Sequence, residues 1–121
     1  MRVLIVEDER LISLVLARMI EALGHKITGR VPSGEAAIAA LEAELEPPDL
    51  VIMDIHLEGA MDGIEAATRI RQRWNIPLAY ASAYSDQVTL DRAAGTAPLA
   101  FLQKPIYPAK LTLVFEALAK I

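Results

Sequence analysis

The stretch VLIVED at residues 3–8 decides the fold. Its first four residues, Val3–Val6, are apolar and mostly β-branched, and the two that follow are acidic. A short continuous apolar run predicts a strand covered on both faces, because a strand with one solvated face alternates apolar and polar side chains. We therefore expect a buried parallel strand that ends at a pair of carboxylates, Glu7 and Asp8.

Four more short apolar segments recur along the chain at intervals long enough for a helix. They predict strands at residues 25–31, 50–53, 77–81 and 99–103. The stretches between and after the strands place apolar residues at helical spacing, which predicts amphipathic helices. The positions expected to face the core are Ile12, Val15, Leu16, Met19 and Leu23; Ala37, Ile38, Leu41 and Leu45; Ile64, Ala67, Ile70 and Trp74; and Leu111, Val114, Phe115 and Leu118.

Residues that favour helix starts lie at the boundaries of these segments. Ser33-Gly34 and Asp62-Gly63 precede the second and third helices. Ser85 offers a side-chain cap for a short fourth helix over about residues 86–94. Pro108 suits the first turn of the last helix, because its missing N–H would have no intrahelical partner there. The boundaries therefore agree with the apolar pattern.

The order of the predicted elements, strand then helix five times over, defines the fold class. Such alternation favours right-handed crossovers and a parallel sheet with helices on both faces. We therefore expect an α/β, flavodoxin-like (βα)5 fold whose five-stranded parallel sheet has the order 2-1-3-4-5. In this order the functional crevice opens outside the carboxyl ends of the first and third strands.

The composition limits the class of protein further. The chain has 121 residues, the size of one compact domain, and we expect that domain to span residues 1–121. It has no cysteine, which excludes disulfides, thiol catalysis and cysteine metal sites. A net charge of -4 and 5% aromatic residues argue against direct nucleic-acid binding. No apolar run approaches the ~18 residues of a membrane span, so we expect a cytoplasmic protein without membrane contact.

Polar side chains gather at the predicted carboxyl ends of the strands. Glu7 and Asp8 end the first strand, Asp54 the third, Ser82 the fourth and Lys104 the fifth. Repulsion between neighbouring carboxylates is relieved when a hard cation with oxygen ligands binds, and Mg²⁺ fits this set best, with Mn²⁺ a possible substitute. A carboxylate, a Mg²⁺, a lysine and a hydroxyl form a cradle for phosphoryl transfer, with an aspartyl phosphate as the product.

Five motifs in this sequence resemble those of the receiver domains of two-component response regulators. They are VLIVEDE at 3–9, DLVIMD at 49–54, MDGIEA at 61–66, Ser82-Ala83 and Lys104-Pro105. Each lies at the end of a predicted element, and together they extend over essentially the whole chain. The resemblance implies a phosphoacceptor switch rather than an enzyme that turns over a substrate.

The resemblance also assigns expected roles to single residues of the site. Asp54 matches the phosphorylated aspartate of the family. Glu7 and Asp8 match the acidic pair that holds Mg²⁺, together with Asp54 itself. His56 stands where the family uses a backbone carbonyl as a metal ligand. Lys104 matches the lysine that pairs with a phosphoryl oxygen.

Three further expectations concern the switch, and two features depart from the commonest pattern. Ser82 matches the switch hydroxyl, Phe101 the switch aromatic, and the bond before Pro105 is often cis in the family. The loop at residues 56–63 is about one residue longer than usual and lacks the frequent proline, which puts its shape and the kinase specificity in question. Serine replaces the commoner threonine at the switch position, and both carry the hydroxyl.

The resemblance implies partners outside this chain. A histidine kinase or a histidine phosphotransfer protein would donate the phosphoryl group to Asp54. The face formed by the fourth helix, fifth strand and fifth helix would then contact a downstream protein partner or a fused effector. The expected oligomeric state is a monomer or a weak homodimer.

Other interpretations of the same residues remain open on sequence alone. Each residue has an ordinary alternative: Glu7 and Asp8 in a solvated loop, Asp54 as a cap, Lys104 on the surface and Ser82 bonded to local backbone. The chain could be an interaction module that works without phosphorylation. It could also be an enzyme that binds FMN or hydrolyses phosphate esters. Acids in place of a glycine-rich loop after the first strand, and a histidine at position 56 in place of a second acid, disfavour that last class.

Overall fold

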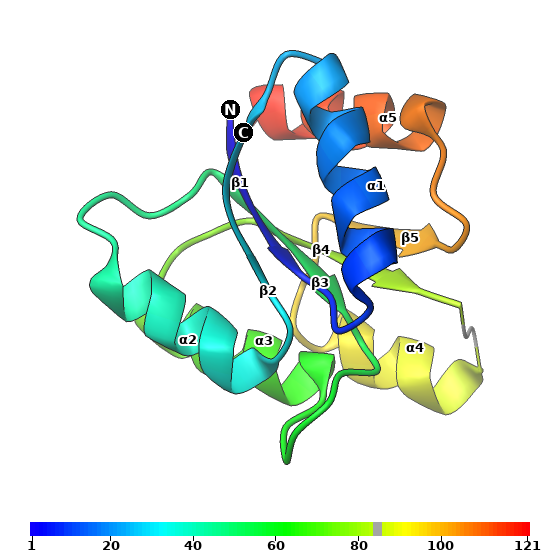
Figure 1. The fold of residues 1–121 in the computed structure, drawn as a ribbon. Coiled ribbons are helices and arrows are strands. Elements are labelled where there is room, and N and C mark those ends of the chain that lie inside the picture. Colours follow the sequence, from blue (N-terminus) through cyan, green and yellow to red (C-terminus); the bar gives the residue numbers. More distant parts are fainter. Residues whose placement is uncertain (84–85) are drawn as a thin grey trace.

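A computed structural model describes residues 1–83 and 86–121, and strands and helices alternate along it as the sequence predicts (Figure 1). The strands and helices are β1 (Arg2–Val6), α1 (Arg10–Ala22), β2 (Lys26–Val31), α2 (Gly34–Ala43), β3 (Leu50–Asp54), α3 (Gly63–Arg73), β4 (Leu78–Ser82), α4 (Gln87–Ala94), β5 (Ala100–Gln103) and α5 (Pro108–Ala119). No helix among the described residues is long and apolar enough to cross a membrane.

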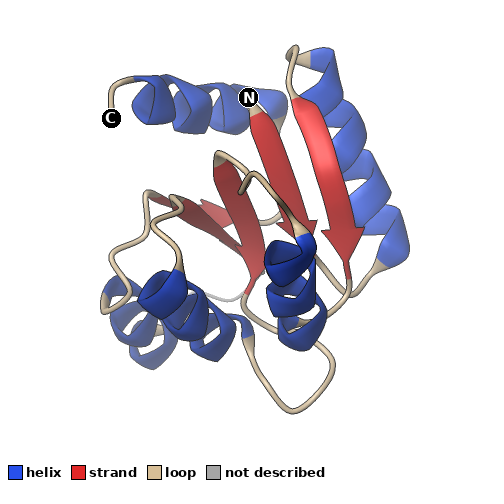
Figure 2. Ribbon diagram, turned by 90° about the vertical axis from the view of Figure 1, so that its left-hand side faces the viewer, coloured by secondary structure: helices blue, strands red, loops and turns tan. Residues whose placement is uncertain are grey.

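The five strands form one parallel sheet in the order β2-β1-β3-β4-β5, which confirms the predicted topology. Figure 2 shows the twisted sheet between its two layers of helices. Strand β1 lies beside β3, with Val6 opposite Met53, so both strands end at the same edge. Strands β3 and β4 extend one residue beyond their predicted ends, which makes Asp54 and Ser82 the last residues of their strands.

Two apolar cores lie on the two faces of the sheet. Helices α1 and α5 cover one face, and α2, α3 and α4 cover the other (Figure 1). Alternate residues of β1 divide between the cores: Val3 and Ile5 join the α1/α5 side, and Leu4 and Val6 join the opposite side. Burial of both faces explains why β1 and β3 have no polar alternation before their final carboxylates.

Side-chain caps at the starts of three helices are clear in the structure. The Ser33 hydroxyl accepts from the Ala36 amide, and the Asp62 carboxylate accepts from the Glu65 amide, so both sequence predictions are confirmed. The predicted cap Ser85 lies outside the described residues. Among the described residues, Asp86 caps α4, because its Oδ2 accepts from the Thr89 amide at 3.0 Å.

The predicted inward face of α1 is wrong in part. Val15 is half exposed and Leu23 lies beyond the end of the helix, whereas the buried face consists of Ser13, Leu16, Ala17 and Ile20. Apolar residues occur almost all round this helix, so periodicity alone could not select the buried stripe. Leu45 is likewise fully exposed, because α2 ends at Ala43. The inward positions predicted for α5 are all buried, which confirms that prediction.

Candidate functional site

Three carboxylates meet at the edge where β1 and β3 end. Glu7 and Asp8 follow β1, and Asp54 is the last residue of β3. One carboxylate oxygen from each of the three lies within 4.8 Å of the others. Glu7 and Asp54 are buried, and Asp8 is partly exposed. Because parallel strands bring their carboxyl ends to one edge, residues 46 positions apart share a single site.

Lys104, which follows β5, reaches into this cluster. Its ammonium group donates hydrogen bonds to Glu7 Oε1 and to Asp54 Oδ2, the latter at 3.2 Å. Partial burial by itself would lower the pKa of the ammonium group, but the hydrogen bond to Glu7 and the charges of Asp54 and Glu7 raise it above its usual value. Lys104 is therefore a fixed positive charge beside the Asp54 carboxylate.

The cluster brings three carboxyl groups together with one ammonium group, so its formal charge is negative when all three are ionised. Burial, and then the hydrogen bond and charge of Glu7, raise the pKa of Asp8 above its usual range. The ionised form of Asp8 is therefore disfavoured, first because the carboxyl is partly removed from water and then because Glu7 lies beside it. Three convergent carboxylate oxygens with unbalanced charge fit a hard divalent cation, which takes oxygen ligands.

The backbone around Asp54 is tightly fixed. The His56 amide donates to Asp54 Oδ1 at 3.3 Å, and the His56 side chain is exposed. On the other side, the Gly63 amide donates to the Ile55 carbonyl at 2.8 Å. A Cβ atom built on Gly63 would lie only 1.9 Å from the Asp54 carbonyl oxygen. Only glycine therefore lets α3 start this close to β3.

The residues predicted for the switch lie on β4 and β5. Ser82 is fully buried, and its carbonyl accepts from the Lys104 amide at 2.9 Å. Phe101 is partly buried, and its ring centroid lies 6.3 Å from that of Tyr80 on the neighbouring strand. The Lys104–Pro105 peptide bond is cis.

A cleft of about 800 Å³ opens beside the carboxylates. Asp8, Asp54, His56 and Lys104 line its polar end. Most of the remaining lining is apolar and comes from α1 and the segment after β5: Leu11, Ile12, Val15, Leu16, Met19, Pro105 and Ile106. Glu9 and Ala83 complete it. Asp8 and Asp54 thus line a cleft whose wall is largely apolar.

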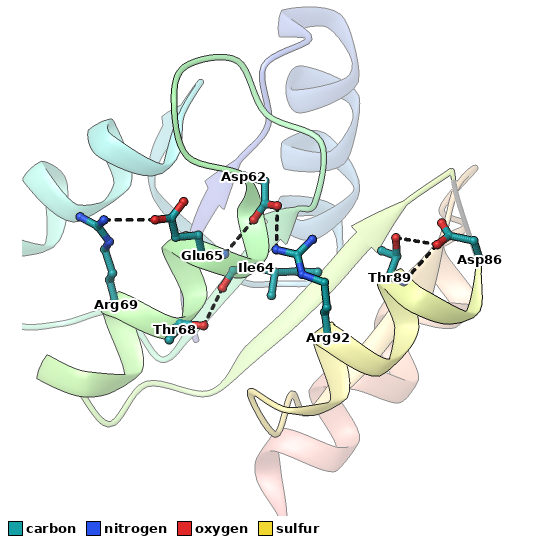
Figure 3. A network of polar contacts seen from close by, with 8 residues as sticks. All are labelled: Asp62, Ile64, Glu65, Thr68, Arg69, Asp86, Thr89 and Arg92. Carbon is teal, nitrogen blue, oxygen red and sulfur yellow. Dashed lines mark hydrogen bonds and ion pairs between the residues drawn. The ribbon is translucent and has the colours of Figure 1, made fainter.

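Sequence reasoning missed two polar links that join this region to α4 and the loop behind it. Arg92 of α4 donates to Asp62, the cap of α3, at 2.9 Å (Figure 3). The buried Tyr80 hydroxyl lies 2.6 Å from Thr96 Oγ1, which itself donates to the Ala93 carbonyl. Burial raises the pKa of the Tyr80 hydroxyl above its usual value, so this link is a neutral hydrogen bond. Local sequence patterns do not predict contacts between residues that are 30 or 16 positions apart.

Comparison with known proteins shows the family to which this fold belongs. The family model of the response regulator receiver domain matches residues 3–116. The chain therefore belongs to the response regulator receiver domain family, as its motifs predict.

One curated protein and one solved structure are similar to the chain over nearly its whole length. It is 40% identical over 115 residues to the transcriptional regulatory protein PdtaR of Mycobacterium tuberculosis, covering 95% of this chain and 55% of that protein. The chain thus spans about half the length of this curated relative. Among solved structures, the receiver domain of a modulated diguanylate cyclase from Desulfovibrio desulfuricans G20 has a TM-score of 0.89 at 35% identity, covering 98% of this chain and 94% of that one.

A second solved structure bears on the carboxylate cluster. The receiver domain of the sensor histidine kinase PA1611 from Pseudomonas aeruginosa PAO1 has a TM-score of 0.84 at 25% identity, with 98% of this chain and 97% of that one covered. That structure has a magnesium ion coordinated in its active-site cleft.

Proposed function

We propose that this receiver domain accepts a phosphoryl group on Asp54 from the phosphohistidine of a histidine kinase or a histidine phosphotransfer protein. The observation that carries the proposal is the environment of one carboxylate. Asp54 has Lys104 Nζ at 3.2 Å from its Oδ2, lies within reach of Glu7 and Asp8, and faces a cleft. This is the arrangement in which a carboxylate can act as a nucleophile toward phosphorus.

Glu7, Asp8 and Asp54, with the backbone carbonyl of His56, would hold Mg²⁺. Their convergence and their excess of negative charge support this assignment, and Mn²⁺ would be a substitute. When bound, the ion neutralises charge on the phosphoryl oxygens during transfer.

The residues of the chain have separate parts in the transfer. An Asp54 oxygen attacks phosphorus as the bond from phosphorus to the donor imidazole breaks, and the imidazole leaves as a neutral ring after taking up a proton. Lys104 stabilises the charge on a phosphoryl oxygen, for which its fixed position beside Asp54 suits it. The Ser82 hydroxyl would then bond another phosphoryl oxygen.

The apolar wall of the cleft would receive the phosphohistidine protein. Leu11 is 72% exposed, and Val15, one helical turn further along α1, is half exposed. Both lie beside the polar end of the cleft that holds Asp54. An amphipathic helix that carries the phosphohistidine could bury these side chains while presenting its phosphoryl group to Asp54.

Phosphorylation would change the surface that a partner contacts through movement of Ser82 and Phe101. Drawing Ser82 toward the phosphoryl group would let the Phe101 ring turn inward and change the face formed by α4, β5 and α5. A downstream protein or a fused effector outside this chain would bind that face. The domain itself would be a monomer or a weak homodimer.

Phosphorylation by a small donor tests the proposal. The protein is incubated with acetyl phosphate and Mg²⁺, and its phosphorylated fraction is measured on phosphate-affinity gels. We expect label in the wild type, none in Asp54→Asn, and at least a tenfold slower rate in Lys104→Gln. Glu58→Gln, which changes an exposed acid of the neighbouring loop, is the matched control and should label normally. Equal labelling of wild type and Asp54→Asn would overturn the proposal.

A further inference from the structure

Helix α4 is the least embedded helix of the domain. Of its eight residues only Ala93 is buried, whereas five residues of α3 are buried. Val88, its large apolar residue near the start, is 71% exposed. Packing alone therefore gives α4 little hold on the sheet, and polar contacts contribute more to its position than they do for α3.

One ion pair connects α4 to the neighbouring helix. The Arg92 side chain of α4 donates to Asp62 Oδ2, the cap residue of α3, at 2.9 Å. The other oxygen of that carboxylate caps α3 by accepting from the Glu65 amide at 2.8 Å. Figure 3 shows Asp62 between the two helices, with both contacts formed. Asp62 is thus held from two sides and gives Arg92 a fixed partner.

The partner of Arg92 is joined directly to the phosphoacceptor strand. Asp62 precedes Gly63, whose amide donates to the Ile55 carbonyl and whose Cα lies against the Asp54 backbone. At its other end α4 follows Ser82, the last residue of β4, by five positions. The ion pair therefore ties α4 to the segment that packs against Asp54, and α4 is also the helix that follows Ser82 in the sequence.

We propose that Arg92 is a positioning residue whose ion pair with Asp62 holds α4 in the arrangement of the unphosphorylated domain, so that breaking the pair favours occupation of Asp54. The inference rests on the proposed function. The inference takes Ser82 to move toward a phosphoryl group and α4 to follow it, while Asp62 stays with the well-packed α3. The pair opposes that movement and so weakens the binding of a phosphoryl mimic at Asp54. By linkage, loss of the pair strengthens that binding by the factor by which the pair weakens it.

Two variants remove the pair in different ways. Asp62→Asn removes the charge but keeps an oxygen that caps α3, because asparagine caps helices as well as aspartate does. Arg92→Gln removes the guanidinium from α4 and leaves the cap untouched. Arg69→Gln is the matched control, since it breaks a somewhat more exposed pair, Arg69–Glu65, that lies within α3 alone. Thermal unfolding of each variant checks that the fold is kept.

The measurement is the affinity for beryllofluoride, a phosphoryl mimic, at saturating Mg²⁺. We expect both pair-breaking variants to bind roughly two- to fivefold more tightly than wild type, as befits an exposed ion pair, with Arg69→Gln unchanged. The double variant should match the single ones rather than add to them. Unchanged or weaker binding in both variants, with a wild type that binds normally, overturns this inference and leaves the proposed function standing. A wild type that binds no more than Asp54→Asn overturns both.

Discussion

Helices α3 and α4 lie next to each other on the same face of the sheet but are held there in different ways. Gly63, Ile64, Ala66, Ala67 and Ile70 of α3 are buried, and the helix starts against the backbone of Asp54. Helix α4 buries Ala93, pairs Arg92 with Asp62, and is followed by Thr96 bonded to Tyr80. One helix is fixed by packing, and the other is positioned largely by polar contacts.

The difference indicates which element can respond to chemistry at Asp54. Moving α3 would open a close-packed core, which costs several kcal/mol. Moving α4 requires the exchange of a few hydrogen bonds and an exposed ion pair, each worth about 1 kcal/mol or less. If Asp54 is phosphorylated as proposed, α4 is therefore the helix that we expect to shift while α3 stays in place.

The largest expected difference between the two helices is the loss of stability when a large side chain is removed from each. Ile70→Ala empties a fully buried position of α3 and should lower the free energy of unfolding by about 2–5 kcal/mol. Val88→Ala removes an exposed apolar side chain of α4 and should change it by less than about 0.5 kcal/mol. Urea denaturation measures both, and similar losses would show that α4 is packed as firmly as α3.

Glycine substitutions test the backbone contacts of the two helices. Gly63→Ala forces a methyl group against the Asp54 carbonyl and should cost about 1–3 kcal/mol or more, with weaker beryllofluoride binding as β3 is displaced. Gly95→Ala, after α4, meets the Arg92 carbonyl at 3.3 Å in a right-handed helical conformation and should be nearly neutral. A neutral Gly63→Ala in the same denaturation experiment would contradict the close approach of α3 to Asp54.

Removal of one hydroxyl sharpens the comparison at the far end of α4. Tyr80→Phe keeps the buried ring but deletes the bond to Thr96, and should cost about 0.5–1.5 kcal/mol. The loss should appear as faster hydrogen exchange of α4 amides than in wild type, with α3 amides unchanged. Equal changes in both helices would mean that Tyr80 supports the whole core rather than the α4 end.

The smallest effect concerns the ionisation of Asp62. Its burial alone would raise the pKa, but the Glu65 amide and the Arg92 guanidinium together lower it below the usual value. The ionised carboxyl therefore stabilises the fold at every pH above about 4, and the contribution disappears as pH falls through the lowered pKa. Carbon-13 NMR of the Asp62 carboxyl should show this low pKa, and Arg92→Gln should raise it. An unchanged pKa in that variant would show that the pair is absent in solution.

The strands of the site and the carboxylates at their ends could be predicted because they follow from local sequence rules. Continuous apolar runs identify β1 and β3 as buried strands, and their final carboxylates must lie at one sheet edge once the topology is known. The caps Ser33 and Asp62 were predictable for the same reason, since the cap and its amide partner are three residues apart.

The features that were missed or wrong depend on tertiary packing. Helical spacing of apolar residues predicts Val15 in the core, but α1 is apolar on nearly every side. Only the packing of α1 on the sheet decides that Ser13 and Ala17 face inward instead. The pair between Asp62 and Arg92 joins residues 30 positions apart through the packing of α4 beside α3. An arginine on an exposed helix gives no signal of its partner in the sequence.

In the proposed function Asp54 is the nucleophile, and its reaction requires a divalent cation at the neighbouring carboxylates. The most direct test is to phosphorylate the protein with acetyl phosphate, reduce the acyl phosphate with borohydride, and locate the modified residue by peptide mass spectrometry. We predict modification of Asp54 alone, abolished by chelation of Mg²⁺ and by Asp8→Asn. Modification at another residue, or equal modification of Asp54 without a divalent cation, would contradict the account.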